Sequence, residues 1–272
     1  EFEKKKVLVV GLGKAGVAAA RFCAERGALV KAVDSKPEGE MRRQVESLAG
    51  RPVEFSFGEG ETQRFAGEEL VVVSPGVPSE SSLVKAAKEG GAEVVGEMEL
   101  AVREIKKPIL AVTGTNGKTT TTTLIGHLLR GAGVRACVAG NIGTPLLDVI
   151  EEAQASDMVV IEVSSFQIET SPSLAPEISV LLNVTPYHLD RHHSFESYSE
   201  CKALLVKRTA AGGFGIYTAA DEVAAASVAG ASCELVPFDA TGRVLSRQEG
   251  RKSAWFGGGD LVVEVRGPAP SR

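Results

Sequence analysis

Short apolar runs alternate with amphipathic stretches along residues 1–97. The segment KKVLVVGLGKAG, residues 5–16, has the pattern of a buried strand, a glycine turn and the start of a helix that ends at Gly27. Further strands are predicted at 28–35, 70–78 and 92–96, with helices at 41–50 and 81–91. Because strands alternate with helices, this part is predicted to form a mostly parallel, doubly wound sheet, as in Rossmann-like domains.

A linking helix at 97–107 precedes a second cycle of the same kind, so a second α/β domain is predicted over 98–272. Its strands are expected at 108–114, 134–141, 156–165 and 178–184, and its helices at 119–133 and 195–209. The segments 213–219, 233–238 and 260–266 are also expected to be strands, increasingly antiparallel, followed by a loop at 266–272. The fold class is therefore α/β with two domains.

Composition narrows the classes of partner. The chain has 272 residues and a net charge of −5, which gives no electrostatic basis for broad nucleic-acid binding. The longest apolar runs have strand length, so no membrane span is expected. The four cysteines are scattered without a C-x-x-C pair, which disfavours a zinc site and a disulfide framework and favours a reducing compartment. We therefore expect a cytoplasmic protein.

The first glycine-rich turn, Gly11-x-Gly13-x-x-Gly16, lies between a predicted strand and a predicted helix. Such glycines allow a tight turn and a close approach of the backbone to a phosphate at the helix N-terminus. Asp34 ends the next strand, near where a ribose-binding acid is expected. The residues alone leave open a dinucleotide site of dehydrogenase type and a tight turn without a ligand.

The second glycine-rich turn, TGTNGKTT at 113–120, also follows a strand and opens a helix. It lacks the first glycine of the usual phosphate loop, because Val112 occupies that position. Lys118 is placed to neutralise terminal phosphates, and the Thr119 hydroxyl is placed to bind Mg²⁺. Glu162, at the end of a strongly apolar strand, is a candidate metal ligand, with a merely paired carboxylate as the alternative.

Three of the four histidines lie in NVTPYHLDRHH, residues 183–193. His188 and His192 are four residues apart, the spacing of a zinc pair on a helix, but Pro186 indicates a loop and no third ligand is evident. Lys202 lies in a predicted helix, and from the residues alone it is a solvated lysine.

The segments TGTNGKTTT, AGNIGTPLLD, IEVSSFQIE and NVTPYHLDRH occur in this order and together resemble the Mur ligase family of ATP-dependent amide-forming enzymes. The short loop without the first glycine is that family's own variant. In the first domain, GLGKAG, Asp34, VSPGVP and VGEMEL resemble the branch that adds D-glutamate to UDP-N-acetylmuramoyl-L-alanine. The resemblance implies a P-loop-type central domain, ATP and Mg²⁺ as cofactors, an acyl phosphate intermediate, and these two compounds as substrates.

The resemblance also implies roles for individual residues. The expected catalytic residues are Lys118, His188 and Lys202, the last as a carbamate. The expected Mg²⁺ ligands are Thr119, Glu162, His188 and Lys202. ATP is expected to bind Gly114, Thr115, Asn116, Gly117, Lys118, Thr119 and Thr120. The UDP-sugar is expected to bind Gly11, Gly13, Lys14, Ala15, Asp34, Ser35, Gly76, Asn141 and His188.

Two features depart from the family pattern. Ala15 stands where relatives often have a serine or threonine that can bond a phosphate. The family's Asn-rich adenine-binding helix and its amino-acid-binding third domain are not visible after Arg266, so we expect a two-domain piece that is inactive by itself. The alternatives are the L-alanine-adding sister ligase, which usually has histidine where Asn116 stands, and a non-catalytic nucleotide-sugar-binding module. A monomer with neither nucleic acid nor membrane as partner is expected.

Overall fold

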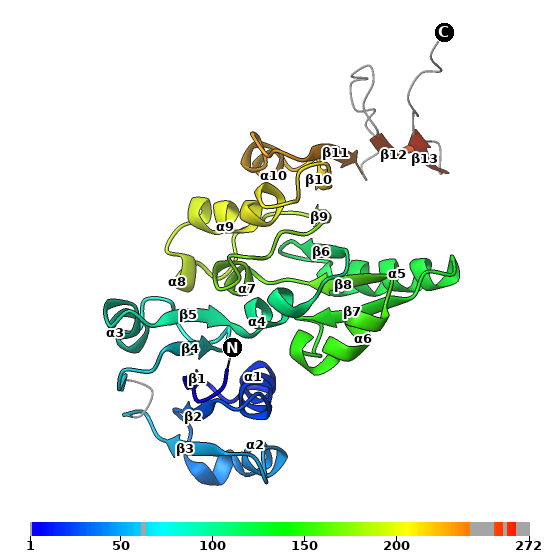
Figure 1. The fold of residues 1–272 in the computed structure, drawn as a ribbon. Helices are drawn as coiled ribbons and strands as arrows, with labels where there is room; N and C mark the ends of the chain where they lie inside the picture. The colour runs from blue at the N-terminus through cyan, green and yellow to red at the C-terminus, as the bar shows by residue number, and fades with distance from the viewer. Residues whose placement is uncertain (1, 61–63, 240–252, 258–259, 265–272) are drawn as a thin grey trace. The chain divides into compact units, whose positions relative to one another are not determined.

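The computed structural model describes residues 2–60, 64–239, 253–257 and 260–264, and the backbone alone of the last two ranges. The chain forms two compact units (Figure 1). Unit 1 contains residues 1–106, 139–155 and 169–173, and unit 2 contains 107–138, 156–168 and 174–272. Two segments from the middle of the chain therefore belong with the N-terminal part. The loop expected at 266–272 lies outside the described residues.

Unit 1 is built on a five-stranded parallel sheet in the order β3-β2-β1-β4-β5. This order is that of a Rossmann-like, doubly wound sheet. The strands are β1 (Lys6–Val10), β2 (Leu29–Asp34), β3 (Val53–Phe57), β4 (Leu70–Val73) and β5 (Glu93–Gly96). The helices are α1 (Lys14–Glu25), α2 (Arg42–Ser47), α3 (Ser82–Glu89) and α4 (Glu97–Glu104), with a 3-10 turn η1 (Glu38–Glu40).

The core of unit 1 follows from the alternation of side chains along its strands. Leu8 and Val10 of β1 are buried with Leu83 and Val84 of α3, so α3 packs on the face that these alternate positions form. The strands read as nearly continuous apolar runs because both faces of a parallel sheet are covered.

The segment after β7 (Ala136–Gly140) contacts the helices of unit 1. It forms η3 (Leu146–Val149) and α6 (Ile150–Ala155), which contact α1 and α4. Glu97 Oε1 accepts a hydrogen bond from Leu147 N at 2.7 Å, and Arg21 forms an ion pair with Asp148 at 2.9 Å. This hydrogen bond and this ion pair explain why residues 139–155 belong to unit 1.

Unit 2 has an eight-stranded sheet in the order β13-β12-β11-β10-β9-β6-β8-β7. Its remaining strands are β6 (Ile109–Thr113), β8 (Met158–Glu162), β9 (Ile178–Leu181), β10 (Phe214–Thr218), β11 (Glu234–Asp239), β12 (Ser253–Gly257) and β13 (Asp260–Glu264). Its helices are α5 (Lys118–Gly131), α7 (Ser165–Glu169, which ends in unit 1), α8 (Leu189–His192), α9 (Phe195–Lys207) and α10 (Glu222–Ser227). The α/β prediction with mostly parallel sheets is confirmed.

The direction of the later strands corrects the expectation from the sequence. β10 and β11 pair in parallel with their neighbours, whereas β12 and β13 are antiparallel to each other. The reason is that α9 precedes β10 and α10 precedes β11, and a helical crossover returns the chain in the same direction. Several elements were missed, among them β3, whose residues are mostly half-buried, the strand β12, and the short helices α7, α8 and α10.

Candidate functional site

The phosphate-loop candidate connects β6 to α5 in unit 2 and depends on two glycines. Gly114 has φ +151° and Gly117 has φ +82°, values that side chains with a Cβ rarely adopt. A Cβ at Gly114 would also lie 3.0 Å from Leu182 Cβ. The loop therefore turns tightly at both glycines, and Gly117 is the N-cap of the 14-residue helix α5. The N-terminus of such a helix favours bound anions.

Lys118 closes the loop in this structure. Its Nζ donates hydrogen bonds to the carbonyl oxygens of Gly114 at 3.0 Å and Thr115 at 2.9 Å. Burial lowers the pKa of Lys118, and the charge of Glu162 opposes this effect. The ammonium group is thus held at the mouth of the loop by two neutral acceptors, which a phosphate with full negative charge can replace.

Thr119 and Glu162 form the candidate metal site. Thr119 Oγ1 donates to Glu162 Oε2 at 2.7 Å, and Glu162 is 2% exposed at the end of β8. Mg²⁺ binds oxygen at 2.0–2.1 Å in octahedral geometry, so two adjacent ligand oxygens are about 2.9 Å apart. The observed separation is close to this value. These two oxygens therefore fit one Mg²⁺.

Asn183 braces the phosphate loop, a role that the sequence did not indicate. Its Oδ1 accepts from Thr115 N at 3.1 Å and from Asn116 N at 2.9 Å, and its Nδ2 donates to Asn116 O at 3.1 Å. The Thr115 hydroxyl in turn accepts a bond from Thr185 N at 3.0 Å. The segment after β9 therefore fixes one side of the loop and leaves the amides at the start of α5 to a ligand.

Lys202 is not a solvated lysine. It is 2% exposed, and its Nζ donates to Gly114 O at 2.9 Å, the carbonyl that Lys118 also uses. Burial, and next the charge of Lys118, lower the pKa of Lys202 to about 7. Its Nζ also lies 4.7 Å from the centre of the ring of Tyr198, whose hydroxyl is 3.2 Å from Thr115 Oγ1. Tyr198 was also missed, since its contacts join distant parts of the chain.

The two histidines have different settings. His188 adopts a left-handed conformation at φ +51° as the N-cap of α8, and its ring lies 4.0 Å from that of Tyr187. His188 is exposed; partial desolvation lowers its pKa, the charge of Asp190 opposes this effect, and the charges of Lys202 and Lys118 add to it. His192 is buried, stacks on Phe166, and its Nε2 lies 2.9 Å from Ser165 Oγ. His192 is therefore a buried packing residue, in contact with Phe166 and Ser165.

The glycine turn of unit 1 is held by the side chains of Asp34, at the end of β2, and Ser74, which directly follows β4. Gly11 has φ +86°, and a Cβ at Gly16 would lie 1.8 Å from Gly11 O, so only glycine fits. Ser74 Oγ donates to Gly11 O at 2.7 Å. Asp34 Oδ2 accepts from Leu12 N at 2.7 Å, and its Oδ1 accepts from Lys36 N at 3.0 Å. In this structure Asp34 holds the turn, and its contact with a ligand stays a prediction.

A cavity of about 570 Å³ lies beside this turn, between α1, α2 and residues 143–148. Of the predicted UDP-sugar residues, Gly13 and Lys14 line it. Lys14 Nζ donates to Gly143 O at 3.0 Å. The other predicted residues of unit 1 lie outside its described lining: Gly11, Ala15, Asp34, Ser35, Gly76 and Asn141. His188 belongs to unit 2.

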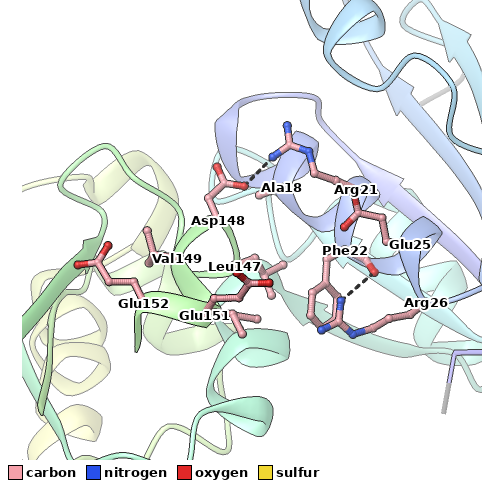
Figure 2. A pocket seen from close by; sticks show the side chains of 11 residues that line it. Ala18, Arg21, Phe22, Glu25, Arg26, Leu147, Asp148, Val149, Glu151 and Glu152 are labelled. Atoms are coloured by element: carbon pink, nitrogen blue, oxygen red, sulfur yellow. Dashed lines mark hydrogen bonds and ion pairs between the residues drawn. The ribbon is translucent and has the colours of Figure 1, made fainter. Parts of the chain in front are cut away.

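A second hollow of unit 1 has a different charge. It measures about 430 Å³ and is lined by α1, η3 and α6. Figure 2 shows Arg21 pointing to Asp148 and Arg26 lying over the ring of Phe22, while Glu151 and Glu152 line the same hollow. With four carboxylates and two guanidinium groups among its lining residues, this hollow does not suit an anionic ligand.

Two family profiles match the chain. Residues 112–259 match the profile described as Mur ligase middle domain, and residues 5–96 match the profile described as Mur ligase MurD-like, N-terminal domain. Across the described residues, no helix combines the length and the apolar character that crossing a membrane requires.

Curated relatives share much of the sequence. A protein of Pelotomaculum thermopropionicum named UDP-N-acetylmuramoylalanine--D-glutamate ligase is 41% identical over 271 residues, which cover 98% of this chain and 57% of that protein. One of the same name from Caldanaerobacter subterraneus subsp. tengcongensis is 50% identical over 202 residues, 74% of this chain and 45% of that protein. The chain thus spans about half the length of these relatives.

Solved structures share the fold. UDP-N-acetylmuramate:L-alanyl-gamma-D-glutamyl-meso-diaminopimelate ligase from Neisseria meningitides aligns with a TM-score of 0.60 at 19% identity, over 95% of this chain and 84% of that one. UDP-N-acetylmuramate-alanine ligase from Thermotoga maritima aligns with a TM-score of 0.50 at 19% identity, over 92% of this chain and 54% of that one. At these identities the likeness concerns the fold alone.

Proposed function

Because the chain belongs to the Mur ligase family, we propose that it supplies the nucleotide-sugar-binding and ATP-binding parts of a ligase that joins D-glutamate to UDP-N-acetylmuramoyl-L-alanine. The observation that carries the proposal is the 41% identity, across 271 residues, to a relative named for this reaction. We further propose that this ligase acts in the synthesis of peptidoglycan precursors, which the same identity supports. By full-length ligase we mean a chain as long as these relatives.

The reaction has two steps. A carboxylate oxygen of UDP-N-acetylmuramoyl-L-alanine attacks the γ-phosphorus of ATP, which gives an acyl phosphate and ADP. The amine of D-glutamate then attacks the acyl carbon, loses a proton, and phosphate leaves with the former carboxylate oxygen. Both steps bring anions together, so the main tasks of the protein are positioning and charge neutralisation.

The phosphate loop positions ATP and neutralises part of its charge. The amides at the start of α5 bind the β- and γ-phosphates, with Asn183 holding the loop in shape. Lys118 exchanges the carbonyls of Gly114 and Thr115 for phosphate oxygens, and its charge then offsets that of the transferred group. Gly114, Thr115, Asn116, Gly117 and Thr120 complete this cradle.

The Thr119 hydroxyl and the Glu162 carboxylate would hold Mg²⁺, which would neutralise phosphate charge when bound. His188 would ligate a second Mg²⁺ and would contact the carboxylate of the substrate. The direction of its pKa supports this role, because partial desolvation of the exposed His188 ring lowers the pKa and so favours the neutral imidazole that ligates metals.

Lys202 acts as a carbamate. The neutral amine attacks CO₂, forms an N–C bond and releases one proton, so a buried cation becomes an anion suited to a metal site. An ordinary lysine with a pKa of about 10.4 is almost entirely protonated at neutral pH. Burial of Lys202 lowers its pKa to about 7, which supplies the neutral amine that this reaction requires.

The UDP-sugar binds unit 1 at the glycine turn, with its diphosphate at the N-terminus of α1. We further propose a cytoplasmic monomer, with neither nucleic acid nor membrane as partner. In support, Cys23, Cys137, Cys201 and Cys233 are buried free thiols, the state that a reducing compartment maintains. Light scattering at increasing protein concentration tests the monomer.

Two assays test the function. The first is calorimetric titration of this chain with UDP-N-acetylmuramoyl-L-alanine and, separately, with NADH. The second is phosphate release by the full-length ligase with ATP and each candidate amino acid. We expect binding of the UDP-sugar and D-glutamate-dependent phosphate release. Release that depends on L-alanine with UDP-N-acetylmuramate indicates the sister ligase, and binding of NADH instead indicates a dehydrogenase.

A further inference from the structure

The cavity beside the glycine turn of unit 1 carries an excess of positive charge. Its lining contains three cations, Lys14, Arg21 and Arg43, and one carboxylate, Asp148. Arg21 and Asp148 form an ion pair at 2.9 Å, so their charges offset each other (Figure 2). Two cations remain, Lys14 on α1 and Arg43 on α2.

Neither remaining cation has an acidic partner among the described residues. Lys14, at the start of α1, donates to the uncharged carbonyl of Gly143. Arg43 is an exposed residue of α2, and within the part of the chain that the structure describes it forms no ion pair. The cavity therefore presents a charge of about +2 to a ligand, before any contribution from the helix.

The helix adds to this field. Gly13 is the N-cap of α1, the first turn of α1 contains no acidic residue, and a Cβ at Gly13 would meet nothing within 4 Å. The N-terminus of this 12-residue helix thus faces open space and favours an anion. A diphosphate diester carries two negative charges at neutral pH, which match the two uncompensated cations.

We propose that Lys14 and Arg43 clamp the diphosphate of the UDP-sugar from two sides, with Arg43 reaching it from α2. This inference rests on the proposed function and adds to it a recognition residue outside the glycine turn. Arg43 binds the ligand directly. The Arg21–Asp148 ion pair holds residues 143–148, which line part of the cavity, in position. On ligand binding, Lys14 exchanges the Gly143 carbonyl for a phosphate oxygen.

The neighbouring residue provides a matched control. Arg42 is the same residue type on the same helix and is also exposed, but it does not belong to the cavity lining. R42A and R43A therefore remove the same charge from the same region of the surface. A general electrostatic attraction predicts equal effects of the two variants, whereas a clamp predicts an effect of R43A alone.

The test is calorimetric titration of the wild-type chain, R42A and R43A with UDP and with uridine. Charge-assisted hydrogen bonds at an exposed site predict a loss of at least about tenfold in UDP affinity for R43A. R42A should bind UDP within about twofold of the wild-type chain, since surface charges contribute little. Uridine, which lacks phosphate, should bind all three proteins alike. K14M should weaken UDP binding as R43A does.

Two results overturn the clamp. Equal UDP affinities of R43A and R42A refute it while leaving the proposed function intact, because the wild-type chain still binds UDP. Failure of the wild-type chain to bind UDP refutes the clamp and the proposed function together. Thermal melting of each variant shows whether it is folded, and both arginines are exposed, so unchanged melting temperatures are expected.

Discussion

Glu97 is a buried carboxyl group whose removal is predicted to stabilise the protein in alkaline solution. It is 3% exposed at the start of α4, and its Oε1 accepts a hydrogen bond from Leu147 N at 2.7 Å. Burial raises the pKa of Glu97 to about 7, and the nearby charge of Asp148 acts in the same direction, while the amides of Leu147 and Leu146 oppose it. E97Q keeps an oxygen acceptor for Leu147 N and cannot ionise.

The magnitude follows from the two pKa values. Between pH 4.5, the ordinary value, and pH 7, the native carboxyl holds a proton that the unfolded chain has released. The unfolding free energy therefore falls as pH rises, by about 1.4 kcal/mol per pH unit, or about 3 kcal/mol in all. This contribution is fully present below pH 4.5 and is lost as pH rises through 7.

Urea denaturation followed by circular dichroism, at pH 5 and at pH 8, measures the effect. We expect E97Q and the wild-type chain to have similar stability at pH 5, and E97Q to be more stable by about 3 kcal/mol at pH 8. E89Q, which changes an exposed glutamate of unit 1, is the control and should follow the wild-type pH profile. A difference between E97Q and wild type that stays constant from pH 5 to pH 8 would refute the reasoning.

Three further predictions concern the ATP site of the full-length ligase. K118A should lower kcat by at least about 100-fold with unchanged UDP-sugar affinity by calorimetry, because phosphate charge is left uncompensated; wild-type turnover would show that this loop does not bind ATP. N183L should raise the KM for ATP about tenfold or more, since Asn116 N loses its acceptor and Thr115 N keeps only the main-chain oxygen of residue 183, whereas N183D keeps the side-chain oxygen and should lose less; equal effects on both would contradict the brace. K202A should lose activity and regain part of it with formate or acetate but not with bicarbonate, and normal activity of K202A at low Mg²⁺ would exclude the carbamate.

Sequence patterns within a few neighbouring residues were enough to predict the two glycine turns and the phosphate-loop residues. The two glycine turns lie between a strand and a helix as expected. A tight turn requires glycine because of its own backbone conformation, whatever the tertiary contacts of the neighbouring elements are. Lys118, Thr119 and Glu162 meet because the loop and the end of β8 share one edge of a parallel sheet.

What the sequence could not provide depends on distant partners. Asn183 and Tyr198 contact the phosphate loop from 67 and 83 residues away, and no spacing rule marks such contacts. Lys202 looks like a surface lysine on an amphipathic helix, and only the packed structure reveals its burial. The directions of β10 and β11 also depend on which strand each one pairs with.

The transfer of a carboxylate oxygen to phosphate tests the central claim most directly. The full-length ligase is supplied with ATP, D-glutamate and UDP-N-acetylmuramoyl-L-alanine that carries ¹⁸O in both oxygens of its alanine carboxylate, and the released phosphate is analysed by mass spectrometry. An acyl phosphate predicts one ¹⁸O atom in each released phosphate, with the other retained in the new amide. Unlabelled phosphate, or label found in AMP, would contradict the account.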